Sequence, residues 1–159
     1  MTTETIKFKI EVYAEYWDKA PMVDVCINGT SKFKELITDT EQNPKIIEFE
    51  HDFIEGDAYK LVINKSNKDL SQTVVENGNI VKDQLLYIKS INIDAVDLGG
   101  LLYDGAYYPT YPEPWATQQR AEGKDLPESY KNVTSMGHDG RWELAMTSPF
   151  YMWLLENLY

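Results

Sequence analysis

Cysteine, histidine and positive charge are scarce in this chain, and each shortage excludes a class of function. Cys26 is the only cysteine, which excludes an internal disulfide and a thiolate metal cluster. The two histidines, His51 and His138, are too few and too far apart for a structural zinc site. With 15 basic and 26 acidic residues the net charge is -11, so no basic stripe exists for nucleic acid or for anionic membrane surfaces.

Long hydrophobic runs are missing as well. No stretch is apolar for long enough to span a bilayer. The first ten residues, MTTETIKFKI, have neither the positive region nor the apolar region of a signal peptide. We therefore expect no membrane insertion and no secretion, and the 43% hydrophobic content predicts a globular protein with a real core.

Strict alternation of apolar and polar residues is the strongest pattern that is present. In residues 6–14 the side chains Ile6, Phe8 and Ile10 share one face, while Lys7 and Lys9 lie on the other. Four further segments of the first hundred residues read as strands, at 22–28, 45–53, 58–65 and 85–93. Short strands without intervening helical periods predict an all-β, antiparallel β-sandwich of the jelly-roll type.

The last fifty-nine residues differ in composition from the first hundred. They hold five of the seven prolines, and the stretch YYPTYPEPW at 107–115 has four aromatic rings in nine positions. Ser148-Pro149 can begin a short terminal helix, with Phe150, Trp153 and Leu154 on one face. We expect a sandwich domain over residues 1–102. A loop-rich aromatic extension over residues 103–159 would then pack on the sandwich or on a neighbouring subunit.

Catalytic residues are not evident. His138 lies in the turn Gly137-His138-Asp139-Gly140, where the acidic neighbour is expected to hold the ring charged. His51 is expected on the solvent face of its strand. No nucleophile elbow is present, and 26 acidic residues are too many to single out a catalytic pair. The sequence predicts a protein that is not an enzyme.

Calcium is the candidate metal, because it binds carboxylate and amide oxygens gathered on loops. One acidic group, Asp94, Asp97 and Asp104, surrounds Gly99-Gly100 and forms the predicted metal site. A second group, Asn77, Asn79 and Asp83, precedes the strand at 85–93. Solvated turn residues would give the same pattern, and neither group matches the EF-hand spacing.

The aromatic residues of the extension are the candidate binding residues. The flat rings of tyrosine and tryptophan, which also carry a hydroxyl or an N–H group, can stack on sugar rings or pack in protein interfaces. Packing over the protein's own sheets and contact with another subunit are equally favoured at this point, ahead of sugar stacking. The predicted ligand- or partner-binding residues are Tyr107, Tyr108, Tyr111, Trp115, Trp142 and Trp153.

Two resemblances refine these expectations. The stretches DQLLYIKSINIDAVDLGGLL (83–102) and MVDVCING (22–29) resemble calcium-dependent xylan-binding β-sandwich modules, with Ala95 where that family usually has glycine. This resemblance covers the first hundred residues, and it implies a jelly roll that binds sugar hydroxyls through a loop-held calcium. The tail, with YPEPW, SMGHDGRWEL and TSPFYMWLLENLY, resembles accessory virion proteins of large tailed bacteriophages.

Together these patterns predict a non-enzymatic structural or binding module. The first hypothesis is a bacteriophage virion protein of the capsid or tail, made in the host cytoplasm, that contacts other virion proteins or its own copies. The alternative is a calcium-dependent carbohydrate-binding module for host or plant-type polysaccharide.

Overall fold

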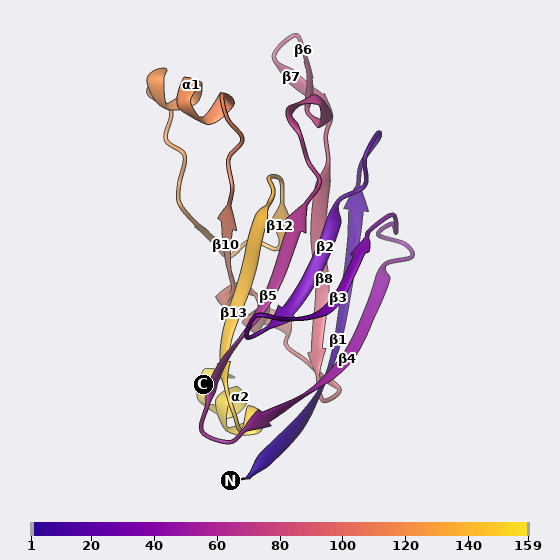
Figure 1. Ribbon diagram of the computed structural model, residues 1–159, viewed down its shortest axis with the longest axis vertical. Coiled ribbons are helices and arrows are strands. Elements are labelled where there is room, and N and C mark those ends of the chain that lie inside the picture. The colour runs from indigo at the N-terminus through magenta and orange to yellow at the C-terminus, as the bar shows by residue number, and fades with distance from the viewer. Residues whose placement is uncertain (1, 159) are drawn as a thin grey trace.

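Two antiparallel sheets form the molecule, in a computed structural model that describes residues 2–158 of the 159 (Figure 1). Their inward side chains join in one hydrophobic cluster, so the predicted antiparallel β-sandwich is confirmed. The first sheet has the order β12 (Ser135–Met136), β8 (Leu85–Ile93), β1 (Thr3–Glu15) and β4 (Lys45–Ile54), with β9 (Val96–Asp97) paired to β8.

The second sheet includes strands from both halves of the chain. Its order is β11 (Tyr130–Lys131), β10 (Ala106–Pro109), β13 (Gly140–Thr147), β5 (Ala58–Ser66), β2 (Met22–Ile27) and β3 (Thr30–Leu36). A separate hairpin pairs β6 (Val74–Glu76) with β7 (Asn79–Lys82). The helices are η1 (Leu70–Gln72), η2 (Gly99–Asp104), α1 (Trp115–Ala121) and α2 (Phe150–Leu158).

The core follows from the two-residue period of the strands. On β1 the side chains of Ile6, Phe8 and Ile10 are buried, and Phe8 stacks on Phe49 of β4 with ring centroids 4.9 Å apart. Trp142 of β13 is the largest fully buried side chain among the described residues. The five strands predicted in the first hundred residues agree with β1, β2, β4, β5 and β8.

Residues 103–159 contribute strands to both sheets. β13 pairs with β5 along eight positions and with β10 on its other side, while β12 pairs with β8. This segment therefore supplies part of both sheets of the sandwich. A division of the chain at residue 102 stays a prediction, which only the folding of the separated pieces would test.

The predicted terminal helix is present as α2, at the end of the sandwich where β1 begins (Figure 1). Ser148 Oγ donates a hydrogen bond to Glu4 at 2.5 Å, and the Phe150 amide donates to the same carboxylate at 3.1 Å. This carboxylate satisfies an amide at the start of the helix, where no intrahelical partner exists. Among residues 2–158 no helix is long and apolar enough to cross a membrane.

His51 corrects one expectation from the sequence. It lies in phase with Ile47, Phe49 and Phe53 on β4, and so on the inward face rather than the solvent face. Its ring centroid lies 4.7 Å from that of Phe53. Burial lowers the pKa of His51, and the nearby Lys32 lowers it further.

Candidate functional site

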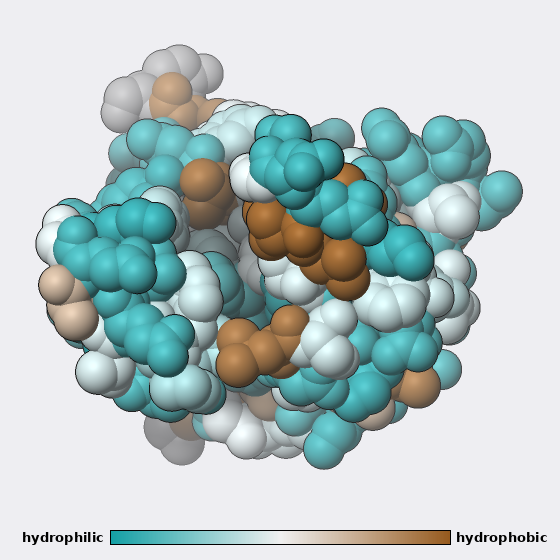
Figure 2. All heavy atoms as spheres, turned by 90° about the horizontal axis from the view of Figure 1, so that it is seen from above, coloured by the Kyte–Doolittle hydropathy of each residue, from teal (hydrophilic) through white to brown (hydrophobic). Residues whose placement is uncertain are grey.

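A cleft of about 540 Å³ opens at the end of the sandwich opposite α2. It lies between the segment that carries α1 and the β6–β7 hairpin, which project from the sheets on opposite sides (Figure 1). Figure 2 looks down on this end, with a hollow near the centre and hydrophobic side chains along its rim. A concave, mostly apolar site with a few polar groups is the usual form of a small-molecule site.

The wall on the α1 side carries Trp115, Pro112 and Thr110. The rings of Trp115, His138 and Tyr111 pack together, with the centroid of His138 5.4 Å from Trp115 and 5.1 Å from Tyr111, and those of Tyr111 and Trp115 6.2 Å apart. The Tyr111 hydroxyl donates to the carbonyl of Pro127 at 2.6 Å. Glu113 accepts a hydrogen bond from the Thr117 amide at 2.9 Å, which satisfies an amide in the first turn of α1. These contacts fix the position of the indole.

The opposite wall is aliphatic and comes from the hairpin and the turn before it. Val75 and Ile80 are paired across the two strands and keep 57% and 62% of their surface exposed, and Leu70 lies beside them on the cleft. Asn77 and Gly78 both have positive φ, at 53° and 80°, as a two-residue hairpin turn requires. The turn accounts for the reversal of the chain in the hairpin. Among residues 2–158 no side chain covers the apolar surface of Val75 and Ile80.

The floor of the cleft contains an ion pair between Lys68 and Asp83. Lys68 Nζ lies 2.7 Å from Asp83 Oδ1 and also donates to the carbonyl of Gly137. The same carboxylate oxygen accepts from the Thr73 hydroxyl at 2.7 Å and from the Gln84 amide at 2.8 Å. Only 9% of the Lys68 side chain is exposed, so this pair is held in a low-dielectric site.

A second ion pair lies directly behind the first. Lys65 is buried and donates to Asp139 Oδ1 at 2.9 Å and to Gln84 Oε1 at 2.8 Å. The Lys68 amide donates to the other oxygen of Asp139 at 3.1 Å. Burial lowers the pKa of Lys65, although Asp139 opposes that effect. These bonds join the end of β5 to the turn before β13, and so fix the floor relative to both walls.

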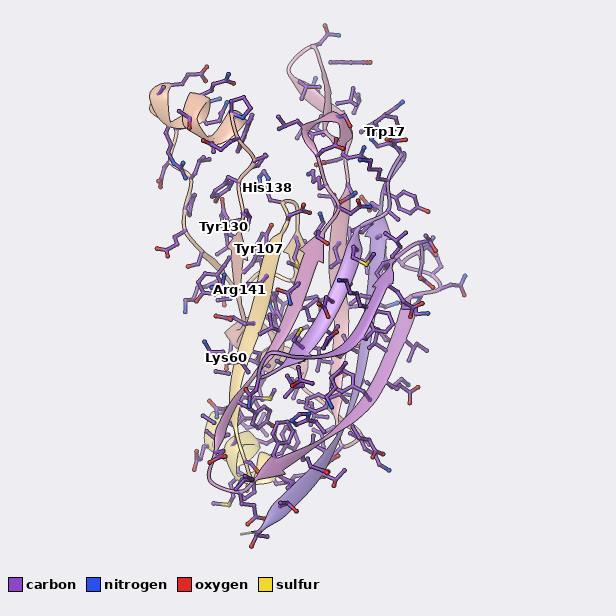
Figure 3. The ribbon with its side chains drawn as sticks, viewed as in Figure 1. Trp17, Lys60, Tyr107, Tyr130, His138 and Arg141 are labelled. Carbon is purple, nitrogen blue, oxygen red and sulfur yellow. The ribbon has the colours of Figure 1, made fainter. Side chains whose placement is uncertain are left out.

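His138 corrects a second expectation. It lies in the turn before β13, as predicted, but the prediction that Asp139 holds its ring charged is wrong. Burial lowers the pKa of His138, and the nearby Lys68 and Lys65 lower it further, against the opposing effect of Asp83 and Asp139. Burial and the two lysines therefore favour the neutral imidazole. In Figure 3 it lies above Tyr107 and Tyr130, at the base of the segment that carries α1.

The predicted aromatic residues occupy four different environments. Trp115 alone of the six lines the cleft, and Tyr111 packs beside it and against His138. Tyr107 is buried, and its hydroxyl donates to the His138 carbonyl at 2.5 Å. Tyr108 lies under the Arg141 guanidinium at 4.4 Å, on the outer face of its sheet.

The remaining two predicted residues are tryptophans of the interior. Trp142 has no exposed surface, and Trp153, on the buried face of α2, is 7% exposed. Rings at that depth cannot contact a ligand on the surface of this fold. The sequence analysis did not single out Lys68 or the hairpin pair Val75 and Ile80, because no local motif distinguishes them from an ordinary turn. It considered His138 only as a charged turn residue.

Comparison with known proteins identifies the fold. No family model and no curated protein matches the sequence. Among solved structures, the chain is similar to the selenomethionine form of vCBM60. That structure is described as linking two families of calcium-dependent carbohydrate binding modules through circular permutation. That similarity has a TM-score of 0.51 and 6% identity, over 87% of this chain and 88% of the other. A structure of vCBM60 in complex with galactobiose gives a TM-score of 0.48 and 8% identity, over 86% and 95%.

At this identity the likeness establishes the fold alone, a β-sandwich shared with a carbohydrate-binding module. The calcium dependence stated for such modules raises the question of which side chains here could hold the ion. Within residues 2–158 no three histidine, cysteine, aspartate or glutamate side chains lie close enough together to bind a metal. The described side chains therefore do not fit a calcium site built from three carboxylates.

The predicted calcium ligands are placed around the turn after β8. The Asp94 side chain accepts from the Lys7 amide at 2.9 Å, and that of Asp97 accepts from the Gly99 amide at 2.9 Å. Asp104 is exposed at the end of η2. In the second acidic group, Asn77 and Asn79 lie at the tip of the hairpin, whereas Asp83 lies on the cleft floor. The described residues do not bring Asp94, Asp97 and Asp104 together as one metal-binding cluster, and calcium binding that involves them stays an untested prediction from the sequence.

Proposed function

We propose that this protein is a non-catalytic carbohydrate-binding module and that the glycan occupies the cleft between α1 and the β6–β7 hairpin. The observation that carries the proposal is the position of the Trp115 indole across a cleft of about 540 Å³ from an aliphatic wall, above a polar floor. The similarity of the fold to a carbohydrate-binding module supports it.

The chemistry of a sugar ring matches these three surfaces. The C–H groups of a pyranose ring form an apolar face that packs on an indole, since aromatic rings bury large apolar areas with a defined geometry. Val75 and Ile80 would cover the opposite face of the ring. The hydroxyls at the ring edge would then point to the floor, where charged groups can hydrogen-bond them.

Replacement of the indole tests this proposal. In Trp115→Ala, affinity for a bound oligosaccharide should fall at least tenfold, because about 1.5–3 kcal/mol of apolar burial is lost. Binding would be measured by calorimetry, after a glycan array of neutral and acidic plant-type polysaccharides has selected the ligand. Trp17→Ala is the matched control: Trp17 is 45% exposed, lies under Lys82 and does not line the cleft.

Two results would reject the proposal. One is an array without any signal; the other is equal loss of affinity in the Trp115→Ala and Trp17→Ala variants. Thermal unfolding of both variants would show whether a loss comes from the cleft or from a change in stability.

Contact with other protein subunits is the second candidate function, and one surface favours it. Four large apolar side chains of α2, Tyr151, Met152, Leu155 and Leu158, are each at least half exposed. An exposed apolar cluster of this kind often marks a protein interface. Assembly with virion proteins would be a particular form of this function.

Sedimentation velocity tests the second candidate. The wild type should form oligomers or bind a neighbour through α2, whereas Met152→Glu with Leu155→Glu should stay monomeric with an unchanged core. A wild type that remains monomeric at every concentration, and that binds no virion protein, would reject this function.

A further inference from the structure

The ammonium group of Lys68 has hydrogen-bonding capacity that the protein itself does not use. An ammonium group has three N–H donors. Within residues 2–158 two of them are used, by Asp83 Oδ1 at 2.7 Å and by the Gly137 carbonyl. Lys68 lines the cleft and 9% of its side chain remains exposed, so a ligand in the cleft can reach the third donor.

Asp83 offers the complementary acceptor on the same floor. Its Oδ1 accepts from Lys68, from the Thr73 hydroxyl and from the Gln84 amide. Its Oδ2 accepts no hydrogen bond from any residue in the part of the chain that the structure describes. The side chain keeps 19% of its surface exposed on the cleft, so a ligand hydroxyl can donate to this oxygen.

We infer that the Lys68–Asp83 pair recognises two adjacent hydroxyls of a neutral glycan. This inference rests on the proposed function and names the chemistry of the ligand. One hydroxyl accepts from Lys68 Nζ, and its neighbour donates to Asp83 Oδ2. Hydrogen bonds to charged groups are stronger than those between neutral groups, and a paired donor and acceptor fix the orientation of the ring.

The charge balance of the cleft selects an uncharged ligand. Asp83 is paired with Lys68, Asp139 with Lys65 at 2.9 Å, and Asp69 with Lys19 at 2.6 Å. A uronate would have to take Lys68 away from Asp83, which would leave a partly buried carboxylate without its partner. Neutral sugars do not require this exchange.

The same pair makes recognition at this floor independent of added calcium. The Lys68 ammonium group already contacts both the Asp83 carboxylate and the Gly137 carbonyl. Carboxylate and carbonyl oxygens are the ligands that calcium binds. A calcium ion at these oxygens would have to displace a positive charge. Neutral-glycan binding in the cleft should therefore persist after chelation.

Calorimetry on the full chain tests the inference, with xylo-, cello- and galacto-oligosaccharides as neutral probes and oligogalacturonides as acidic probes. At least one neutral series should bind, with an affinity unchanged by EDTA, and the acidic series should not bind. Lys68→Met should weaken binding about ten- to a hundredfold, because a hydrogen bond to a charged group is lost.

Two further variants keep the test informative if Lys68→Met unfolds. Lys68→Arg retains the charge and the donors, and should recover part of the affinity. Lys60→Met makes the same substitution on an exposed lysine that pairs with Glu143 at 3.7 Å on the outer face of the second sheet (Figure 3), and should bind like the wild type.

The outcomes separate the two proposals. Binding that Trp115→Ala abolishes but Lys68→Met leaves unchanged would overturn the inference and retain the proposed function. Loss of neutral-glycan binding on chelation, or preference for oligogalacturonides, would also overturn the inference alone. No binding of any probe would overturn both.

Discussion

The two ends of the sandwich use apolar side chains in opposite ways. At one end α2 closes the core, with Phe150 at 0% exposure and Trp153 at 7%. At the other end Trp115, Val75 and Ile80 stand apart around a cleft and remain partly or largely exposed. The first end is sealed by hydrophobic burial, whereas the second is held open by buried ion pairs.

This difference shows which interactions determine the structure of each end of the sandwich. Burial has no preferred direction, so apolar groups alone tend to close a cavity. Hydrogen-bonded ion pairs have fixed geometry, and those of Lys65 and Lys68 hold β5, the hairpin base and the turn at His138 in one arrangement. Substitutions at the closed end should therefore change stability, and substitutions at the open end should change binding.

The largest expected effect is at the closed end. Phe150→Ala should lower the free energy of unfolding by about 3–5 kcal/mol, since a fully buried aromatic ring is removed and a cavity remains. Urea unfolding measures the loss. Glycan affinity of the folded protein should stay the same, and a parallel loss of affinity would show that the two ends are coupled.

A smaller effect at the same end concerns the carboxylate that holds the start of α2. Glu4→Ala should cost about 1–3 kcal/mol, because the Ser148 hydroxyl and the Phe150 amide lose their acceptor. Glu4→Gln keeps an acceptor and should cost less. Equal stability of the two variants, measured by urea unfolding, would mean that solvent satisfies both donors.

Lowering the pH should reduce the stability of the folded protein through two histidines, His138 near the cleft and His51 near the opposite end. The pKa of His138 and that of His51 are both lowered in the folded state, mainly by burial. The unfolded chain therefore binds more protons below its histidine pKa of about 6.5. Stability should be complete above this pH and should fall as the pH is lowered through the window down to the folded-state pKa values.

The cleft contribution to this pH effect can be separated from that of His51. In His138→Gln the fall in stability below pH 6.5 should be smaller, leaving the part due to His51. NMR titration of the wild type should give both histidines a pKa below the value for an unfolded peptide. A His138 pKa above that value would show that Asp83 and Asp139 outweigh burial, Lys65 and Lys68.

The smallest changes in stability are expected at two turns, one at each end of the sandwich. Asp94-Ala95, after β8, and Asn77-Gly78, in the hairpin, have similar positive φ angles, 49° and 63° against 53° and 80°. Ala95→Gly should stabilise and Gly78→Ala should destabilise, each by about 1 kcal/mol, because only glycine adopts positive φ without strain. Thermal unfolding checks both, and equal signs would mean that local contacts outweigh the backbone preference.

Much of the sandwich was predictable because alternation is a local property. Ile6, Phe8 and Ile10 identify β1 without any tertiary information. The same signal exists in β13, where Trp142, Leu144 and Met146 point inward, but the aromatic and proline content of the region favoured a loop. His51 was assigned to the wrong face of its strand. Ile47 and Phe49 define the inward face, and His51 lies an even number of positions from both.

The cleft could not be predicted in the same way. Trp115 lies 35 positions beyond Ile80, and only the order of the strands brings α1 and the hairpin to the same end. Lys68 and Asp83 flank the hairpin and pair across its base, but acidic and basic residues beside a turn are most often solvated. The charge of His138 depends on burial, which its neighbours in the sequence do not reveal.

The position of β13 has a consequence for how the protein is made. This strand lies between β10 and β5 in the second sheet, although it follows every other strand of that sheet along the chain. Until residue 147 has emerged, the edge of β5 that it will cover is an unpaired row of amides and carbonyls. The sheet can therefore be completed only after the chain from Ser66 to Thr147 has been made, and until then the nascent chain exposes an aggregation-prone edge.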